Sequence, residues 1–89
     1  MSETTAVKTV MAVMIDNRKD AAEKVQKILT GWGCLIKTRL GLHDGVLDNC
    51  SEHGLIILEM VGAEEKHEEL CRKLNLLEGV DANYMKLSL

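Results

Sequence analysis

The stretch from residue 37 to residue 62, KTRLGLHDGVLDNCSEHGLIILEMVG, constrains the fold of this chain more than any other. It starts as an alternating strand pattern, continues through a polar segment with glycines at residues 41–54, and ends in the apolar run of residues 55–61. That order predicts two strands joined by a long loop. The final run is apolar on both faces except at Glu59, which predicts a central strand covered on both sides.

A strand and a helix flank this stretch on each side. Residues 5–15 and 34–40 predict strands before the loop, with Ile36, Thr38 and Leu40 sharing one face of the second strand. Apolar residues recur at helical spacing over residues 21–32 and again over residues 63–77. Asp16 or Asn17 is placed to cap the first helix, and residues 80–87 predict a fourth strand.

The predicted order of elements is therefore βαββαβ, which defines an α+β, ferredoxin-like sandwich. Right-handed crossovers place both helices on one face of a four-stranded antiparallel sheet, with the first and third strands in the centre. We expect a single domain over residues 1–89, in which residues 1–4 form a flexible polar start.

The opposite face of such a sheet has no helix to cover it. Both faces of the first strand are largely apolar, so Val7, Met11, Val13 or their neighbours must lie on that open face. A chain of 89 residues is marginally stable by itself, and burial of this face would help it. We therefore expect a homo-oligomer that forms through the open sheet face or through the edge strands.

Composition narrows the function classes. The net charge of −3 gives no basic footprint, and Trp32 and Tyr84 are the only aromatic residues, so direct nucleic-acid binding is not expected. The sequence shows neither a signal segment nor a run long enough to cross a bilayer, which favours the cytoplasm and no membrane association. Three cysteines without CxxC spacing are typical of reduced thiols.

The loop at residues 41–54 holds the richest set of metal-binding groups. Imidazole, thiolate and carboxylate side chains together suit Zn²⁺, Ni²⁺ or Fe²⁺. Cys50 and His53 can bind one divalent transition metal, with His43 or Cys34 completing the coordination shell. The alternative is an ordinary solvated loop. The candidate groups are His43, Asp44, Asp48, Cys50, Glu52 and His53.

The turn at residues 16–20 is a second candidate site. A strand that leads into a helix exposes backbone N–H groups, which bind anions or ligand carboxylates. Plain helix capping is the alternative. The candidate ligand-binding residues are Asp16, Asn17 and Arg18 in this turn and Arg39 on the second strand.

Catalytic motifs are missing from the sequence. It contains no P-loop, GxSxG, HExxH or dinucleotide-binding pattern, so we predict no catalytic residues and a non-enzymatic protein. His67 lies on the apolar stripe of the second predicted helix and is expected to be a packed or interface histidine. Cys34 and Cys71 are expected to be small buried hydrophobic residues, because neither has a catalytic base nearby in the sequence.

Three segments carry a resemblance to a known family: VMIDNRKD at residues 13–20, RLGL at residues 39–42 and GLIILE at residues 54–59. In these segments the chain resembles the iron-only hydrogenase system regulators, which are ACT-like ferredoxin folds. The resemblance implies a stand-alone domain that oligomerises through its sheets and has a regulatory role in hydrogenase or metal biology. The chain lacks the Pro-Gly of typical ACT domains and the multi-histidine pattern of nickel-responsive regulators.

Three hypotheses follow from these observations. The leading one is a non-enzymatic, oligomeric regulatory domain that binds a small ligand and can act on a regulatory protein partner. The second is a metal-binding sensor that uses the loop residues His43, Cys50 and His53. The third is a protein-interaction module without a small ligand.

Overall fold

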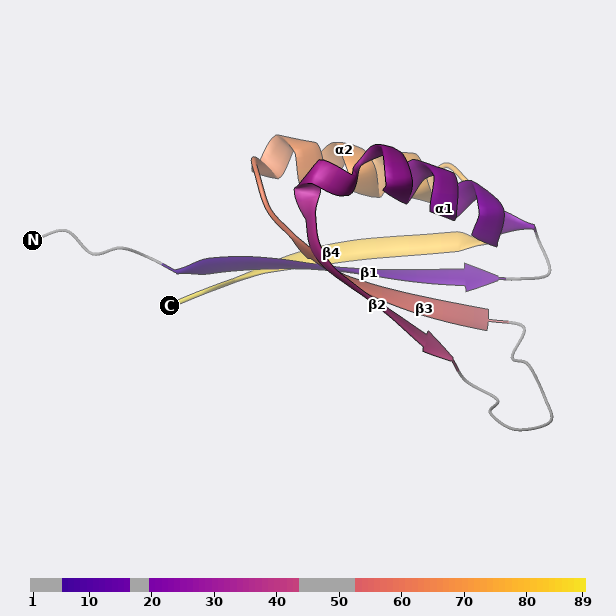
Figure 1. The fold of residues 1–89 in the computed structure, drawn as a ribbon, viewed down its shortest axis with the longest axis horizontal. Helices are drawn as coiled ribbons and strands as arrows, with labels where there is room; N and C mark the ends of the chain where they lie inside the picture. The colour runs from indigo at the N-terminus through magenta and orange to yellow at the C-terminus, as the bar shows by residue number, and fades with distance from the viewer. Residues whose placement is uncertain (1–5, 17–19, 44–52) are drawn as a thin grey trace, which may run out of the picture.

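The computed structural model describes residues 6–16, 20–43 and 53–89. It confirms the predicted order of strands and helices (Figure 1). The elements are β1 (Val7–Asp16), α1 (Ala21–Gly31), a 3₁₀ turn (Gly33–Leu35), β2 (Ile36–His43), β3 (His53–Met60), α2 (Glu64–Asn75) and β4 (Val80–Ser88).

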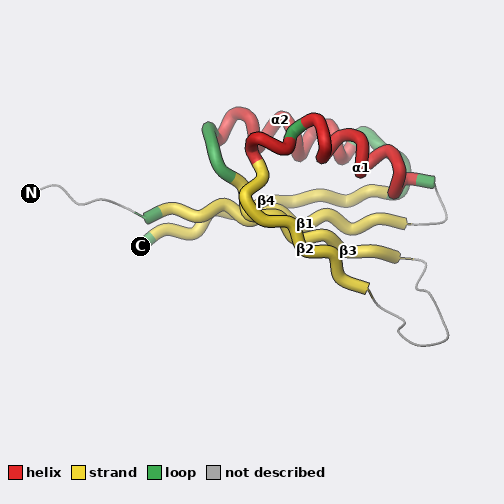
Figure 2. Tube along the Cα trace, in the orientation of Figure 1, coloured by secondary structure: helices red, strands yellow, loops and turns green. Residues whose placement is uncertain are grey.

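The strands form one antiparallel sheet in the order β2-β3-β1-β4, so the first and third strands are central as predicted. Both helices lie on the same face of this sheet, and the other face is uncovered in the described part of the chain (Figure 2). The α+β ferredoxin-like sandwich is therefore confirmed.

The core lies between the helices and the sheet. Alternate residues of β1 and β3 point toward the helices, and the buried positions of α1 and α2 recur every three or four residues. Aliphatic side chains and methionines fill this layer, as the near absence of aromatic residues requires. The fully buried large side chains are Met11, Leu29, Leu58, Leu70, Leu74, Val13 and Val25.

Strand β2 departs from the predicted alternation. Its pairing with β3 shifts between Ile36 and Thr38, which marks an irregularity of the β-bulge kind at Lys37. Ile36 packs against the core, whereas Thr38 pairs with Glu59 on the open side of the sheet. The prediction that Ile36 and Thr38 share a face was wrong, because an extra residue in one strand reverses the alternation.

The turn into α1 also differs from the prediction. Asp16 is the last residue of β1 rather than a helix cap, and its backbone N–H donates to the carbonyl of Gly79 at 2.7 Å. Asp20 precedes the helix in a left-handed conformation, with φ of 58°. Asn17 and Arg18 lie outside the described residues. No helix among the described residues is long and apolar enough to span a membrane.

Candidate functional site

The open face of the sheet is mainly apolar. The strand register places side chains in rows that cross β2, β3 and β1, and two of these rows on the open face are apolar throughout. Several of these side chains are about half exposed. This confirms the expectation of an uncovered apolar face, although the neighbours of Met11 and Val13 lie there rather than those residues themselves. The side chains are Leu42, Leu55 and Met14 in one row and Leu40, Ile57 and Ala12 in the next.

A shallow groove of 340 Å³ continues this face toward β4. Val10, Leu40 and Leu87 contribute its apolar lining, and Lys8 and Glu59 stand at its charged border. An apolar face with a charged border is the pattern of a protein–protein interface.

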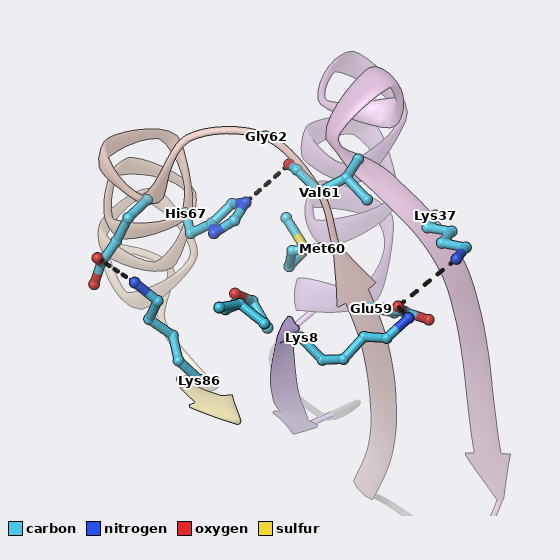
Figure 3. A pocket seen from close by; sticks show the side chains of 11 residues that line it. Lys8, Lys37, Glu59, Met60, Val61, Gly62, His67 and Lys86 are labelled. Carbon is cyan, nitrogen blue, oxygen red and sulfur yellow. Dashed lines mark hydrogen bonds and ion pairs between the residues drawn. The ribbon is translucent and has the colours of Figure 1, made fainter. Parts of the chain in front are cut away.

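A second pocket, of 330 Å³, lies where β3 ends and α2 begins (Figure 3). The pocket forms because the start of β1 extends beyond the end of β3. The pairing of β1 with β3 begins at Thr9 and Met60, whereas Val7 and Lys8 pair only with β4. The chain then turns sharply toward α2 at Gly62, whose φ of 94° favours glycine. We call this space the α2 pocket.

Lysines converge on the α2 pocket from three strands. Lys8 of β1 and Lys37 of β2 share one carboxylate, that of Glu59, at 3.3 and 4.0 Å. On the other side, Lys86 of β4 donates a 2.7 Å hydrogen bond to Glu64 (Figure 3). That hydrogen bond lowers the pKa of Glu64 and raises the pKa of Lys86. Three ammonium groups face two carboxylates, so the lining carries an excess of positive charge.

His67 lies at the inner wall of the α2 pocket and is only 3% exposed. Its Nε2 is 2.8 Å from the carbonyl oxygen of Val61, and its ring makes an edge contact with Tyr84. Its Nδ1 is buried and has no hydrogen-bond partner within the described residues. The prediction that His67 packs as a buried residue is thus confirmed, but one ring nitrogen remains unsatisfied.

Of the predicted ligand-binding residues, the structure describes Asp16 and Arg39, and these two line different hollows. Asp16 lines a hollow with His53 and Gly79 at the end of β1. Arg39 lines a different hollow, beside Ile15, and hydrogen-bonds to Gln26 of α1. Asn17 and Arg18 lie outside the described residues, so a site at this turn stays a prediction.

The predicted metal ligands are only partly described. The backbone register places His43 opposite Gly54, and His53 opposite Asp16, at the same end of the sheet. Cys50 lies outside the described residues. The part of the chain that the structure describes holds no group of three or more metal-binding side chains, and the loop site stays a prediction.

The two described cysteines do not form a reactive centre. Cys34 lies within the 3₁₀ turn and is exposed, so the prediction that it is a buried structural residue was wrong. The Sγ of Cys71 lies 3.3 Å from the carbonyl oxygen of Ala82, and burial raises the pKa of the Cys71 thiol. A raised pKa reduces the thiolate fraction, so Cys71 is a weaker nucleophile than an exposed thiol.

Comparison with known proteins supports the fold. No protein family and no curated protein matches the sequence. Solved structures do match over nearly the whole chain. The uncharacterized protein TM1266 from Thermotoga maritima has a TM-score of 0.77 at 18% identity, covering 94% of this chain and 99% of that one.

Two further structures belong to PII-like proteins. CPII from Thiomonas intermedia K12, a nitrogen regulatory PII-like protein bound to ADP, AMP and bicarbonate, matches with a TM-score of 0.62 at 10% identity, covering 97% and 96% of the two chains. A proposed PII-like signalling protein from Thermus thermophilus matches with a TM-score of 0.56 at 13% identity, covering 98% of this chain and 93% of that one. The chain therefore shares the ferredoxin-like architecture of PII-like proteins, and at these identities the likeness concerns the fold.

Proposed function

We propose that this chain is a non-enzymatic regulatory domain that works as a homo-oligomer and binds a small effector. The observation that carries the proposal is the open sheet face, on which Met14, Leu40 and Leu42 are half exposed. A single copy would leave this apolar surface in water, whereas packing against a second copy removes it. The shared architecture with PII-like regulatory proteins supports an effector-binding role.

The open face is a better candidate for association than the outer edge of β4. The side chain of Asn75 accepts from the N–H of Ala82 at 2.8 Å and donates to its carbonyl oxygen at 2.9 Å. These bonds occupy backbone groups on the outer edge of the strand, and an occupied edge cannot extend the sheet at that point.

Native mass spectrometry of protein purified without chelator tests the proposal. We expect a multimer, with a small molecule retained when the effector binds tightly. A monomer at micromolar concentration would contradict the proposal, because the open face would then be stable in water. The mass of any retained species would identify the class of effector.

The regulatory role can be stated more finely from the resemblance to iron-only hydrogenase system regulators. We place the domain in control of that enzyme system, through a protein partner. Deletion of the gene in its native host should change iron-only hydrogenase activity in cell extracts. Unchanged activity under conditions that induce the enzyme would contradict this assignment.

A metal sensor is the second candidate. It is favoured by the β2–β3 and β1–β3 pairings, which bring His43, His53 and Asp16 to one end of the sheet. In this proposal Cys50 supplies a further ligand. Replacement of His43, Cys50 and His53 by alanine should then abolish bound zinc or nickel, as measured by inductively coupled plasma mass spectrometry. An unchanged metal content would remove the candidate.

A further inference from the structure

From the geometry of the α2 pocket we infer that it binds a small oxyanion that carries a hydroxyl group, of the bicarbonate or hydrogenphosphate kind. The inference rests on the proposed function, because it names the class of effector that the regulatory domain takes. It is carried by His67, whose buried and unpartnered nitrogen requires a specific ligand group, and by the lysines around it.

The tautomer of His67 follows from its neighbour. The carbonyl oxygen of Val61 can only accept, so the Nε2 of His67 must carry the hydrogen of the 2.8 Å contact. In a neutral imidazole the Nδ1 is then a bare acceptor. Figure 3 shows this second nitrogen pointing away from Val61, on the side of the ring that faces Lys86. A buried acceptor without a donor is unfavourable, and a ligand hydroxyl would satisfy it once the imidazole ring turns enough to bring this nitrogen to the pocket surface.

The charges of the pocket select an anion. Lys8 and Lys37 share a single carboxylate, so one ammonium charge on that side is not neutralised within the described residues. The start of α2 contributes backbone N–H groups, because no side chain in the described residues caps its first turn, while Glu64 and Glu65 in that turn offset part of the positive field. The start of α2 favours an anion, and the buried nitrogen of His67 favours a ligand that donates a hydrogen bond.

The size and hydrogen-bond pattern define the ligand further. A volume of 330 Å³ lies at the lower end of the range for small-molecule sites. The lysines supply donors to negative oxygens, while His67 demands a donor from the ligand. Bicarbonate and hydrogenphosphate present both kinds of group. Sulfate has a similar shape but carries no proton at neutral pH, so it satisfies the lysines and leaves His67 unpaired.

Isothermal titration calorimetry of the full chain with phosphate, bicarbonate and sulfate at constant ionic strength tests the inference. We expect phosphate or bicarbonate, depending on which is the natural ligand, to bind about tenfold or more tightly than sulfate, since one hydrogen bond to a charged group is at stake. Equal affinity for all three anions would overturn the role of His67, and no binding of any of them would overturn the site.

Lysine variants locate the binding. The double variant Lys8→Met and Lys37→Met keeps the long apolar side chains and removes two charges from the pocket. Lys24→Met with Lys27→Met removes the same charge from the exposed side of α1 and is the matched control. We expect the first pair to weaken binding about tenfold or more and the control to have little effect. Equal losses in both variants would overturn the site.

Light scattering on the same samples separates this inference from the proposed function. A multimer that binds none of the anions overturns the oxyanion site and leaves the oligomeric domain standing. A monomer that binds phosphate or bicarbonate through Lys8 and Lys37 supports the site and counts against the proposed oligomer. Backbone amide shifts of Val61 and Gly62 in ¹H–¹⁵N spectra during the titration confirm that the ligand occupies the α2 pocket, because both residues line it.

Discussion

Replacement of two leucines on the open face should dissociate the oligomer without unfolding the chain. Leu40 of β2 and Leu87 of β4 both line the groove on this face and are 52% and 54% exposed in the single chain. The double variant Leu40→Ser and Leu87→Ser removes apolar surface that a second copy would bury. The fold should persist, because neither side chain belongs to the core.

The size of the effect follows from these exposures. Complete burial of a leucine side chain stabilises by about 1.5–3 kcal/mol. About half of each of these side chains is still exposed, so its burial in a dimer contributes roughly 1 kcal/mol per leucine. A symmetric dimer contact contains each leucine twice. The double variant should therefore lose about 4 kcal/mol of association free energy, which weakens the dimer roughly 1,000-fold.

Sedimentation equilibrium across a range of concentrations measures this change. Leu76→Ser is the matched control, since Leu76 is 72% exposed but lies at the end of α2, on the helix side of the sheet. Thermal melting followed by circular dichroism shows whether the variants remain folded. An unchanged dissociation constant in the folded double variant would refute the assignment of the open face as the contact.

Three further predictions concern the described residues. Asn75→Ala removes both hydrogen bonds to the backbone of Ala82 and should lower the free energy of unfolding by about 1–2 kcal/mol in urea titrations; no measurable change would mean that water replaces them fully. Gly62→Ala places a Cβ 2.6 Å from Leu35 Cδ2 at a φ of 94° and should cost about 1–3 kcal/mol, whereas Gly33→Ala, with nothing within 4 Å, should cost much less. Similar losses would refute the crowding argument. Iodoacetamide should modify exposed Cys34 faster than Cys71, whose thiol has a raised pKa, as measured by peptide mass spectrometry; equal rates would contradict this.

The fold was predictable because hydrophobic periodicity is a local signal. The β-branched and apolar residues over 5–15 and the apolar run over residues 55–61 can each be recognised from a few neighbouring positions. The connection rules then leave few ways to arrange two strand–helix units. The irregularity at Lys37 was not predictable in the same way, since it depends on how β2 pairs with a strand far along the chain.

The α2 pocket could not be read from the sequence for a related reason. Lys8, Lys37 and Lys86 are distant in the chain, and each resembles an ordinary surface lysine at its own position. The helical spacing correctly predicted that His67 packs inward, but not that one of its nitrogens lacks a partner there. The carbonyl oxygen of Val61 accepts the hydrogen bond from the other ring nitrogen, Nε2. The position of this carbonyl depends on the turn at Gly62, which precedes the helical pattern around His67.

Lys8 and Glu59 border both the groove on the open face and the α2 pocket, so association and anion binding should be linked. An anion that draws Lys8 away from Glu59 changes the charge at the rim of the interface. If anion binding changes the association constant of the chain by some factor, thermodynamic linkage requires that association change the anion affinity by that same factor. We expect phosphate or bicarbonate to bind the dissociated variant, Leu40→Ser with Leu87→Ser, with an affinity that differs about fivefold or more from that of the wild type. Identical affinities in calorimetry would show that the ion pair between Lys8 and Glu59 does not connect the two surfaces.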